Sequence, residues 1–284
     1  MIRSSLRNKL LVAFLCIGIL PFAIITIISV LKAQKALHQQ AFSQMQGMRD
    51  VKKGQVVSYL QTIKDQSLTL SENHMIIDAM TEFSGTYSSF IAENSLSEDD
   101  IVALRKELAK YYKNDFSNEY KEQNTGKAPG VDALVKQLKD ETVAFQYYYI
   151  KNNPNPLGSK DELKAAEDSS HYSQVHGLYH PTIRNFLKKF GYYDIFLVHP
   201  DTGTIIYSVF KELDFTTSLT TGPYANTNFG EAFKKANASN SKDAVIFTDF
   251  KQYFPSYEAP AGFVASPIFN GDKKIGVLIF QFPL

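Results

Sequence analysis

The sequence predicts an α+β protein in which an N-terminal transmembrane helix and a long helical stalk precede an antiparallel five-stranded sheet with flanking helices. Three observations predict this class. Residues 10–31 carry no charge, residues 32–83 contain no proline, and five short segments rich in β-branched and aromatic residues lie between residues 194 and 282. Helices followed by a run of strands are typical of the α+β class.

Residues 10–31 are predicted to be a membrane anchor. A helix rises 1.5 Å per residue, so this segment covers roughly the 30 Å of a bilayer's hydrocarbon core. Pro21 lies at its middle and is expected to kink the helix, which membrane helices tolerate. The alternatives are a buried core helix and a cleaved signal peptide. The apolar part of a signal peptide is usually about 7–15 residues long and ends in a small-residue site. Residues 32–36 (KAQKA) show no such site, so we expect the anchor to be retained.

Flanking charges predict the orientation of this anchor. Arg3, Arg7 and Lys9 precede it, whereas Lys32 and Lys35 follow it. The positive-inside rule therefore places residues 1–9 in the cytoplasm and the rest of the chain outside. The prediction is a single-pass protein of a bacterial inner (cytoplasmic) membrane with a periplasmic domain, which is a receiver of external conditions and not an enzyme.

Composition agrees with a folded, anchored domain. The chain has 284 residues, 44% of them hydrophobic, and a net charge of +1. This is enough material for one or two cores, and it lacks the clustered basic excess that nucleic-acid binding requires. Cys16 is the only cysteine and lies in the anchor, so the outer part has no disulfide and no cysteine-ligated metal site.

Residues 32–146 are expected to form a helical stalk or bundle that begins with one long helix over residues 32–83. Its apolar stripe would pack against a helix of the same chain or form the seam of a homodimer, which is the protein partner that we expect. A capping box over Ser95–Glu98 predicts a helix through Tyr112. A loop over residues 124–130 and a helix over residues 131–149 follow. The Tyr147–Tyr149 cluster that closes this helix would pack in the core or line a pocket. The stripe consists of Leu37, Met45, Met48, Val56, Leu60, Ile63, Leu70 and Ile77.

Residues 152–158 (NNPNPLG) predict a turn, after which three histidines invite a metal-site hypothesis. His176 and His180 would share a helix face, and His171 precedes them. However, Gly177 and Pro181 argue against a helix there, so we expect structural histidines, no metal and no cofactor. Residues 181–190 predict a short helix with Pro181 in its first turn.

Strands are predicted over residues 194–198, 204–210, 244–250, 262–269 and 274–282. Turns at residues 200–203 and at Asn270–Asp272 join the first pair and the last pair into hairpins. A polar, turn-bearing segment over residues 211–228 and a short helix over residues 229–237 separate the two hairpins. Pro267 predicts an edge position or a bulge for the fourth strand.

This order resembles the extracytoplasmic Cache sensor domains, which are PAS-like. The resemblance rests on residues 190–198 (FGYYDIFLV), 206–212 (IYSVFKE), 222–224 (GPY), Asp249-Phe250, Tyr253, 255–257 (PSY), Pro260-Ala261 and 275–278 (IGVL). These residues are similar to the sensory region of bacterial methyl-accepting chemotaxis proteins, which also precedes membrane-bound nucleotide cyclases. The resemblance covers residues 147–284, which form the expected sensor domain. Such receptors continue into further sensor sequence and an output domain, so the resemblance implies a fragment, a truncated gene or a sensor without its own output.

A PAS-like pocket implies a concave sheet under helices and a lid loop. Lys211 would pair with a ligand carboxylate, Asp249 would accept from a ligand ammonium, and the tyrosines would form walls. The alternative for each is packing and capping of the sheet. The chain has no tryptophan, so the longer amino-acid-sensing motif of this superfamily is not intact and the ligand stays open. The predicted ligand-binding residues are Tyr207, Lys211, Tyr224, Asp249, Tyr253, Tyr257 and Phe263.

The functional hypotheses follow from this architecture. The first is the sensory region of a chemoreceptor that binds a small molecule and transmits a helix shift across the membrane. The second is the input domain of a membrane-bound cyclase or sensor kinase. The third is an anchored structural protein whose sheet has a filled core and no ligand pocket. No nucleophile elbow, P-loop, HExxH or Rossmann glycine pattern occurs in the sequence.

Overall fold

The computed structural model describes residues 5–282, so Arg3 and the last two residues lie outside the description. The chain divides into two compact units, of which the first ends at Gln61 and the second begins at Thr62. The helices are α1 (Leu6–Ser71), α2 (His74–Tyr87), α3 (Phe90–Glu93), α4 (Glu98–Tyr111), α5 (Ser117–Gln123), α6 (Asp132–Gln137), α7 (Asp140–Gln146), α8 (His171–Phe190) and α9 (Asn228–Ala238). The strands are β1 (Asp194–Val198), β2 (Ile205–Ser208), β3 (Ile246–Tyr253), β4 (Ala259–Asn270) and β5 (Lys273–Phe282).

Helix α1 contains the predicted anchor. Among the described residues it is the one helix whose length and composition would let it cross a membrane. The helix continues through Pro21. Its exposed residues 10–31 lie in the first unit, and residues 62–71 belong to the second unit, where Ile63, Ser67, Leu70 and Ser71 are buried.

The prediction of one helix over residues 32–83 is wrong at residues 72–73. Asn73 adopts an extended backbone conformation with φ −70° and ψ 129°, and its side chain accepts a hydrogen bond from the Met75 N–H. An asparagine side chain at this position caps the first turn of a new helix. Residues 32–83 therefore form α1 and α2, with the break at an N-cap that the apolar pattern does not reveal.

The remaining helices differ from expectation in their ends. The cap of α4 is Ser97 with Asp100, not Ser95 with Glu98, and Ser95 has φ 52°. The helix predicted over residues 131–149 is divided into α6 and α7 at Leu138, whose backbone is extended with ψ 134°. Arg105 donates to the carbonyls of Val135 and Leu138 and thereby satisfies the end of α6. A π-helical turn over residues 147–151 follows α7.

Helix α8 is longer than predicted. It runs continuously from His171 to Phe190, so Pro181 lies inside it and not in its first turn. Ser170 caps its start by accepting from the Ser173 N–H, and Gly191, with φ 75°, ends it. A proline inside a helix costs free energy because it removes one backbone hydrogen bond. In α8 the burial of one face offsets this cost. The buried residues of this face include Tyr172, His176, His180 and Ile183.

The sheet confirms the α+β prediction. Its five strands are antiparallel in the order β2-β1-β5-β4-β3. Gly203 (φ 65°) and Gly271 (φ 59°) supply the left-handed residues of the two predicted hairpin turns. Pro267 lies in an interior strand. On the β3 side, however, Pro267 has no paired strand, because the β3–β4 pairing stops at Ile246 and Ala265. A bulge follows at Ile268–Phe269.

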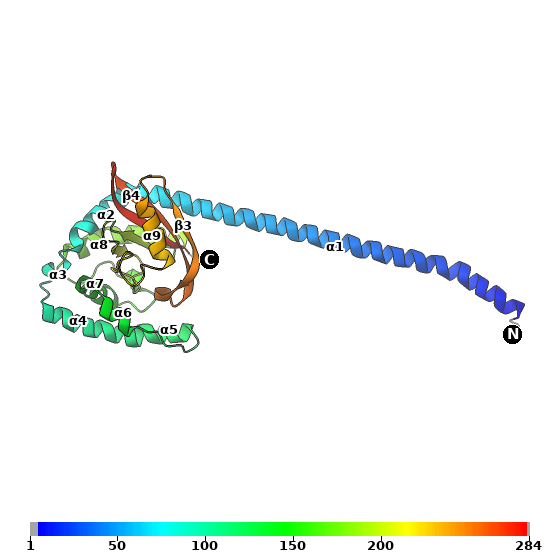
Figure 1. The fold of residues 1–284 in the computed structure, drawn as a ribbon, viewed down its shortest axis with the longest axis horizontal. Coiled ribbons are helices and arrows are strands. Elements are labelled where there is room, and N and C mark those ends of the chain that lie inside the picture. Colours follow the sequence, from blue (N-terminus) through cyan, green and yellow to red (C-terminus); the bar gives the residue numbers. More distant parts are fainter. Residues whose placement is uncertain (1–4, 283–284) are drawn as a thin grey trace. The chain divides into compact units, whose positions relative to one another are not determined.

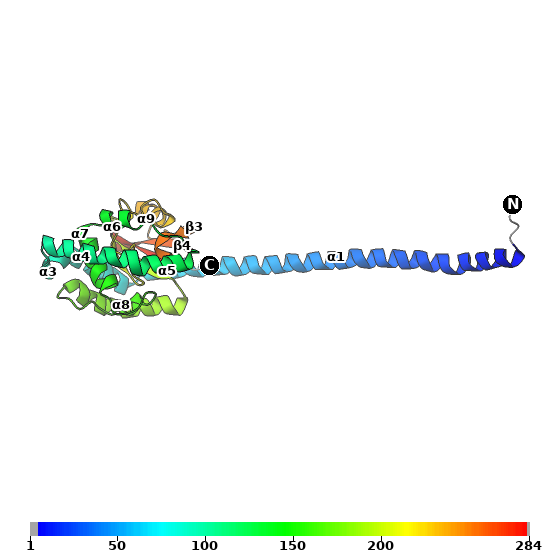
Figure 2. The ribbon, with the colours of Figure 1, turned by 90° about the horizontal axis from the view of Figure 1, so that it is seen from below.

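Helices cover both faces of this sheet within the second unit. Helix α9 packs on β3, β4 and β5, whereas α2 contacts β2, β4 and β5 and α8 contacts β1. Helices α4 and α5 run in line along one side of the unit (Figure 1 and Figure 2). Residues 62–146 of the predicted helical stalk or bundle (residues 32–146) lie in the same compact unit as the sheet, and α2–α7 share its core.

Candidate functional site

A buried run of charged residues follows strand β2. Lys211, Glu212 and Asp214 are 2%, 9% and 0% exposed, although these residue types are almost never buried without a partner. The sequence pattern predicted a polar, turn-bearing segment here, but residues 211–219 are buried throughout. Buried ionisable groups that lack a structural explanation mark candidate functional sites. We call Lys211–Asp214 the charged segment.

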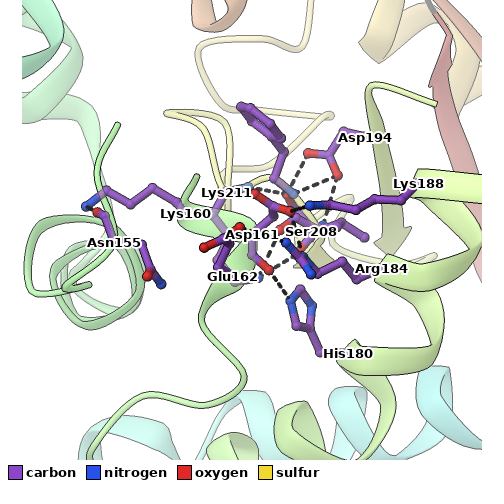
Figure 3. Close-up of polar contacts among 12 residues, drawn as sticks. Asn155, Lys160, Asp161, Glu162, His180, Arg184, Lys188, Asp194, Ser208 and Lys211 are labelled. Atoms are coloured by element: carbon purple, nitrogen blue, oxygen red, sulfur yellow. Dashed lines mark hydrogen bonds and ion pairs between the residues drawn. The ribbon is translucent and has the colours of Figure 1, made fainter. Parts of the chain in front are cut away.

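Asp194, at the start of β1, anchors the charged segment. Its Oδ1 accepts from the backbone N–H groups of Ile195 (2.6 Å), Val209 (2.9 Å) and Phe210 (3.0 Å), and its Oδ2 accepts from Ser208 Oγ at 2.7 Å. Figure 3 shows Asp194 and Ser208 beside Lys211. Burial raises the pKa of the Asp194 carboxyl to about 6, while these hydrogen bonds and the positive charge of Lys211 favour its ionised form.

Lys211 points into the core on the α8 side of the sheet. Its backbone has φ 61°, and its Nζ donates to the carbonyls of Ser208 (3.0 Å) and Val209 (3.2 Å). The Nζ also lies 5.6 Å from the ring centroid of Tyr207 and 5.8 Å from that of Tyr149, within the range of a cation–π contact. Burial lowers the pKa of this ammonium to about 7, against the attraction of Asp194.

Glu212 borders a cavity of about 330 Å³, which we call the Glu212 cavity. Its Oε1 accepts from the Tyr193 hydroxyl at 2.6 Å and its Oε2 accepts from Ser256 Oγ at 2.7 Å. Burial, and then the charge of Asp214, raise the pKa of the Glu212 carboxyl to about 8. The cavity lies between the charged segment, the residues that follow β3, the ends of α4 and α5, and the loop at residues 157–160. The lining includes five aromatic residues, Tyr111, Phe116, Tyr193, Phe210 and Tyr257.

Asp214 closes the charged segment on the α9 side. Its Oδ2 accepts from the Tyr253 hydroxyl at 2.6 Å, while its Oδ1 has no partner among the described residues. Burial raises the pKa of the Asp214 carboxyl to about 7. Gln146 of α7 donates to the carbonyls of Leu213 (2.9 Å) and Phe215 (2.8 Å), so the helices before the sheet hold the segment in place.

Proton linkage at Glu212 gives a pH prediction. The pKa of Glu212 rises from its usual value near 4.5 to about 8, so between pH 5 and 7.5 the folded chain holds a proton that the unfolded chain has released. The free energy of unfolding therefore falls as the pH rises through this window, by up to about 1.4 kcal/mol per pH unit from Glu212 alone.

We expect the free energy of unfolding of Glu212→Gln, relative to the unchanged chain, to rise between pH 5 and pH 7.5. Urea unfolding of both chains at several pH values measures this difference, in which the contributions of all other groups cancel. A difference that stays constant with pH would show that Glu212 is ionised in the folded state over the whole range.

His176 and His180 share a face of α8, as predicted, and their ring centroids lie 4.4 Å apart, but His171 does not join them. His180 donates from Nε2 to the Asp161 carbonyl (2.7 Å) and accepts from the Tyr207 hydroxyl at Nδ1 (2.8 Å), as Figure 3 shows in part. His176 donates from Nδ1 to the Lys164 carbonyl, whereas His171 is exposed and contacts Glu93. Burial lowers the pKa of His176 and His180, so both are neutral. Among residues 5–282, no three side chains of His, Cys, Asp or Glu are placed to hold a metal.

The predicted ligand-binding residues lie in three places. Lys211 and Tyr257 border the Glu212 cavity, and Tyr207 lies behind Lys211 under α8. The next three, Tyr224, Tyr253 and Phe263, share the core under α9, where Phe263 stacks on Phe229 with ring centroids 4.5 Å apart. Asp249 is exposed, and its carboxylate accepts from the Phe250 N–H. A role of these seven residues in ligand binding stays a prediction.

Sequence reasoning missed Glu212, Asp214, Asp194 and Tyr193. One signal was present. Asp194 begins a strand whose other residues, Ile195–Val198, are apolar, and a carboxylate at such a position needs several donors. Those donors come from the turn after β2, so the signal points to residues 208–210 and to the segment that follows.

Comparisons with known proteins add little to this geometry. No family model matches the chain, and no curated protein matches it. Among solved structures it is similar to the sensor domain of the histidine kinase DctB from V. cholerae, with 14% sequence identity and a TM-score of 0.31. The match covers 62% of this chain and 58% of that sensor domain. A likeness this distant establishes neither a shared fold nor a shared function.

Proposed function

We propose that this chain is the membrane-anchored, extracytoplasmic sensory region of a signalling protein. In this proposal, residues 10–31 span a bacterial inner membrane, the unit that begins at Thr62 binds a small molecule, and α1 carries the response towards the membrane. The Glu212 cavity supports a binding role, because pockets of about 300–1,000 Å³ with aromatic walls and a few polar groups are typical of small-molecule sites.

Two adjacent tyrosines carry the proposal. The Tyr193 hydroxyl donates to Glu212 at the cavity, and the Tyr192 hydroxyl donates to Gln66 Oε1 of α1. The backbone N–H of Tyr193 also donates to the Gln281 carbonyl, which fixes this dipeptide to β5. A ligand that moves Glu212 would therefore shift one residue of a pair whose other member contacts the end of α1.

The finer proposal is the sensory region of a methyl-accepting chemotaxis protein, supported by the residue-level resemblance over residues 190–278. A homodimer through α1 would suit it, because apolar residues such as Met45, Met48 and Val56 are exposed on this helix. The input domain of a cyclase or a sensor kinase is the second candidate. An anchored structural protein is disfavoured by the cavity and by the buried charged segment, which a filled core would not need.

A ligand screen tests the sensory role. The full chain in lipid nanodiscs is heated with amino acids, organic acids and amines in turn. We expect at least one compound to raise the Tm and to change amide hydrogen exchange at residues 62–71 by fivefold or more, since allosteric coupling is worth about 1–3 kcal/mol. A folded chain that none of these compounds stabilises, or that is stabilised with no change at residues 62–71, would argue against a sensor.

A further inference from the structure

The Glu212 cavity holds a buried carboxylate that lacks a cationic partner. Both oxygens of Glu212 accept hydrogen bonds from neutral hydroxyls, those of Tyr193 and Ser256. Gln281 Nε2 donates in turn to Ser256 Oγ at 3.2 Å, so a second residue orients this donor. Among the described residues, Glu212 makes no ion pair. Burial keeps this carboxyl group protonated below about pH 8, but the two donors favour its anionic form, which a positive charge placed in the cavity would stabilise.

The two lysines that border the cavity do not supply this charge. Lys160 directs its Nζ at the carbonyls of Asn153 (2.9 Å) and Asn155 (2.6 Å). Lys211 directs its Nζ at the carbonyls of Ser208 and Val209 and at the rings of Tyr149 and Tyr207. A second carboxylate, Glu119, lines the same cavity. The charged groups of the lining that are left to contact a ligand are therefore the carboxyl groups of Glu212 and Glu119, which favour a cationic binding group over a carboxylate.

Five aromatic side chains line the cavity beside Glu212 and pack in pairs. Phe116 stacks with Tyr257, with ring centroids 5.1 Å apart, and Tyr193 packs against Phe210 at 4.9 Å. A cation over such rings gains about 0.5–2 kcal/mol, most when it is desolvated. Aromatic walls around a carboxylate are the recognition chemistry of amines and quaternary ammonium groups.

We propose that the Glu212 cavity binds a small organic cation, an amine or a quaternary ammonium compound, whose positive charge pairs with Glu212 between aromatic walls. This inference rests on the proposed sensory function in that the cation would be the sensed molecule. It names the chemical class that the sequence left open, and it assigns recognition to Glu212, Phe116 and Tyr257 in place of Lys211 and Asp249.

Binding should depend on pH in a defined direction. Burial and the carboxyls of Asp214 and Asp194 raise the pKa of Glu212 to about 8 in the empty cavity, against the hydrogen bonds from Tyr193 and Ser256. The other titratable groups at the cavity are Tyr111, Glu119, Lys160, Lys211 and Tyr257. Below pH 8 a cation must displace the proton of Glu212. The Kd is therefore expected to fall by up to tenfold per pH unit between pH 6 and 7.5 and to level off above pH 8.

A matched pair of probes tests the ligand class. Choline and 3,3-dimethyl-1-butanol have the same shape, but only choline carries a positive charge. Ethanolamine represents primary amines, and succinate represents carboxylates. Binding to the full chain in nanodiscs is measured by calorimetry. We expect choline or ethanolamine to bind at least tenfold more tightly than the neutral alcohol, and Glu212→Gln to remove this preference while the alcohol binds as before.

Further variants keep the test decisive. Phe116→Leu retains apolar volume but removes a ring face, and should weaken choline severalfold even if Glu212→Gln does not fold. Equal binding of choline and the alcohol, binding of succinate in the cavity, or no binding of either cation to the folded chain would overturn the proposed ligand class. Cation binding without any change in exchange at residues 62–71 would instead leave this class standing and contradict the sensory function.

Discussion

Replacing Asp194 by alanine is expected to lower the free energy of unfolding by about 3–5 kcal/mol. The substitution removes the acceptor of three backbone N–H groups and of the Ser208 hydroxyl, all of them buried or nearly so. It also leaves the Lys211 ammonium in the core without the carboxylate that attracts it. Urea unfolding of the full chain, followed by near-ultraviolet circular dichroism of its tyrosines, measures the loss.

Asp194→Asn is the matched control. The amide oxygen can still accept from the backbone N–H groups, so we expect a smaller loss, on the order of 1–2 kcal/mol, mostly from the lost charge near Lys211. If Asp194→Ala cost less than about 0.5 kcal/mol, Asp194 would not anchor the charged segment, and the position of Glu212 would need another explanation.

Replacing Phe145 by alanine in the otherwise unchanged chain is expected to lower the free energy of unfolding by about 3–5 kcal/mol. Phe145 of α7 is fully buried, and its ring centroid lies 3.9 Å from that of Phe90, 4.6 Å from that of Tyr172 and 4.8 Å from that of Tyr87. These rings join α2, α3, α7 and α8. The loss should appear as one cooperative transition of the whole second unit, because the helices and the sheet share this core.

Phe190→Ala serves as the comparison for Phe145→Ala. Phe190 ends α8 and is 50% exposed, so its removal should cost less than about 1 kcal/mol. Similar costs for the two substitutions, or a separate early transition of the helices in Phe145→Ala, would show that α2–α7 are not part of the same cooperative unit as the sheet.

The parts of the fold that sequence reasoning predicted depend on local signals. The turn at Asn270–Asp272 contains a glycine that adopts φ 59°, and apolar segments flank it, so the β4–β5 hairpin is visible in the sequence. The absence of charge from residues 10–31 likewise predicts a long apolar helix without reference to any other segment. Such features need only nearest neighbours along the chain.

The parts that were missed depend on distant partners. Helix α8 continues through Pro181 because its apolar face is buried, and that face is covered by residues of α2 and of the sheet. The charged segment reads as a loop because its donors and covering groups come from Asp194, Gln146, Tyr193 and Ser256. No sequence pattern in residues 211–214 indicates these contacts. The sequence analysis therefore predicts Lys211 as a site residue but not its neighbour Glu212.

The side of the membrane on which the second unit lies is the most direct test of the sensory account. Cys16 is the only cysteine, so Cys16→Ala provides a background for single cysteines at the exposed positions Ser5 and Asn240. Intact bacterial cells that express the full chain are treated with a membrane-impermeant maleimide. The account predicts that Asn240→Cys is labelled in intact cells and Ser5→Cys only after permeabilisation. Labelling of Ser5→Cys but not Asn240→Cys in intact cells would place the Glu212 cavity in the cytosol and contradict the account.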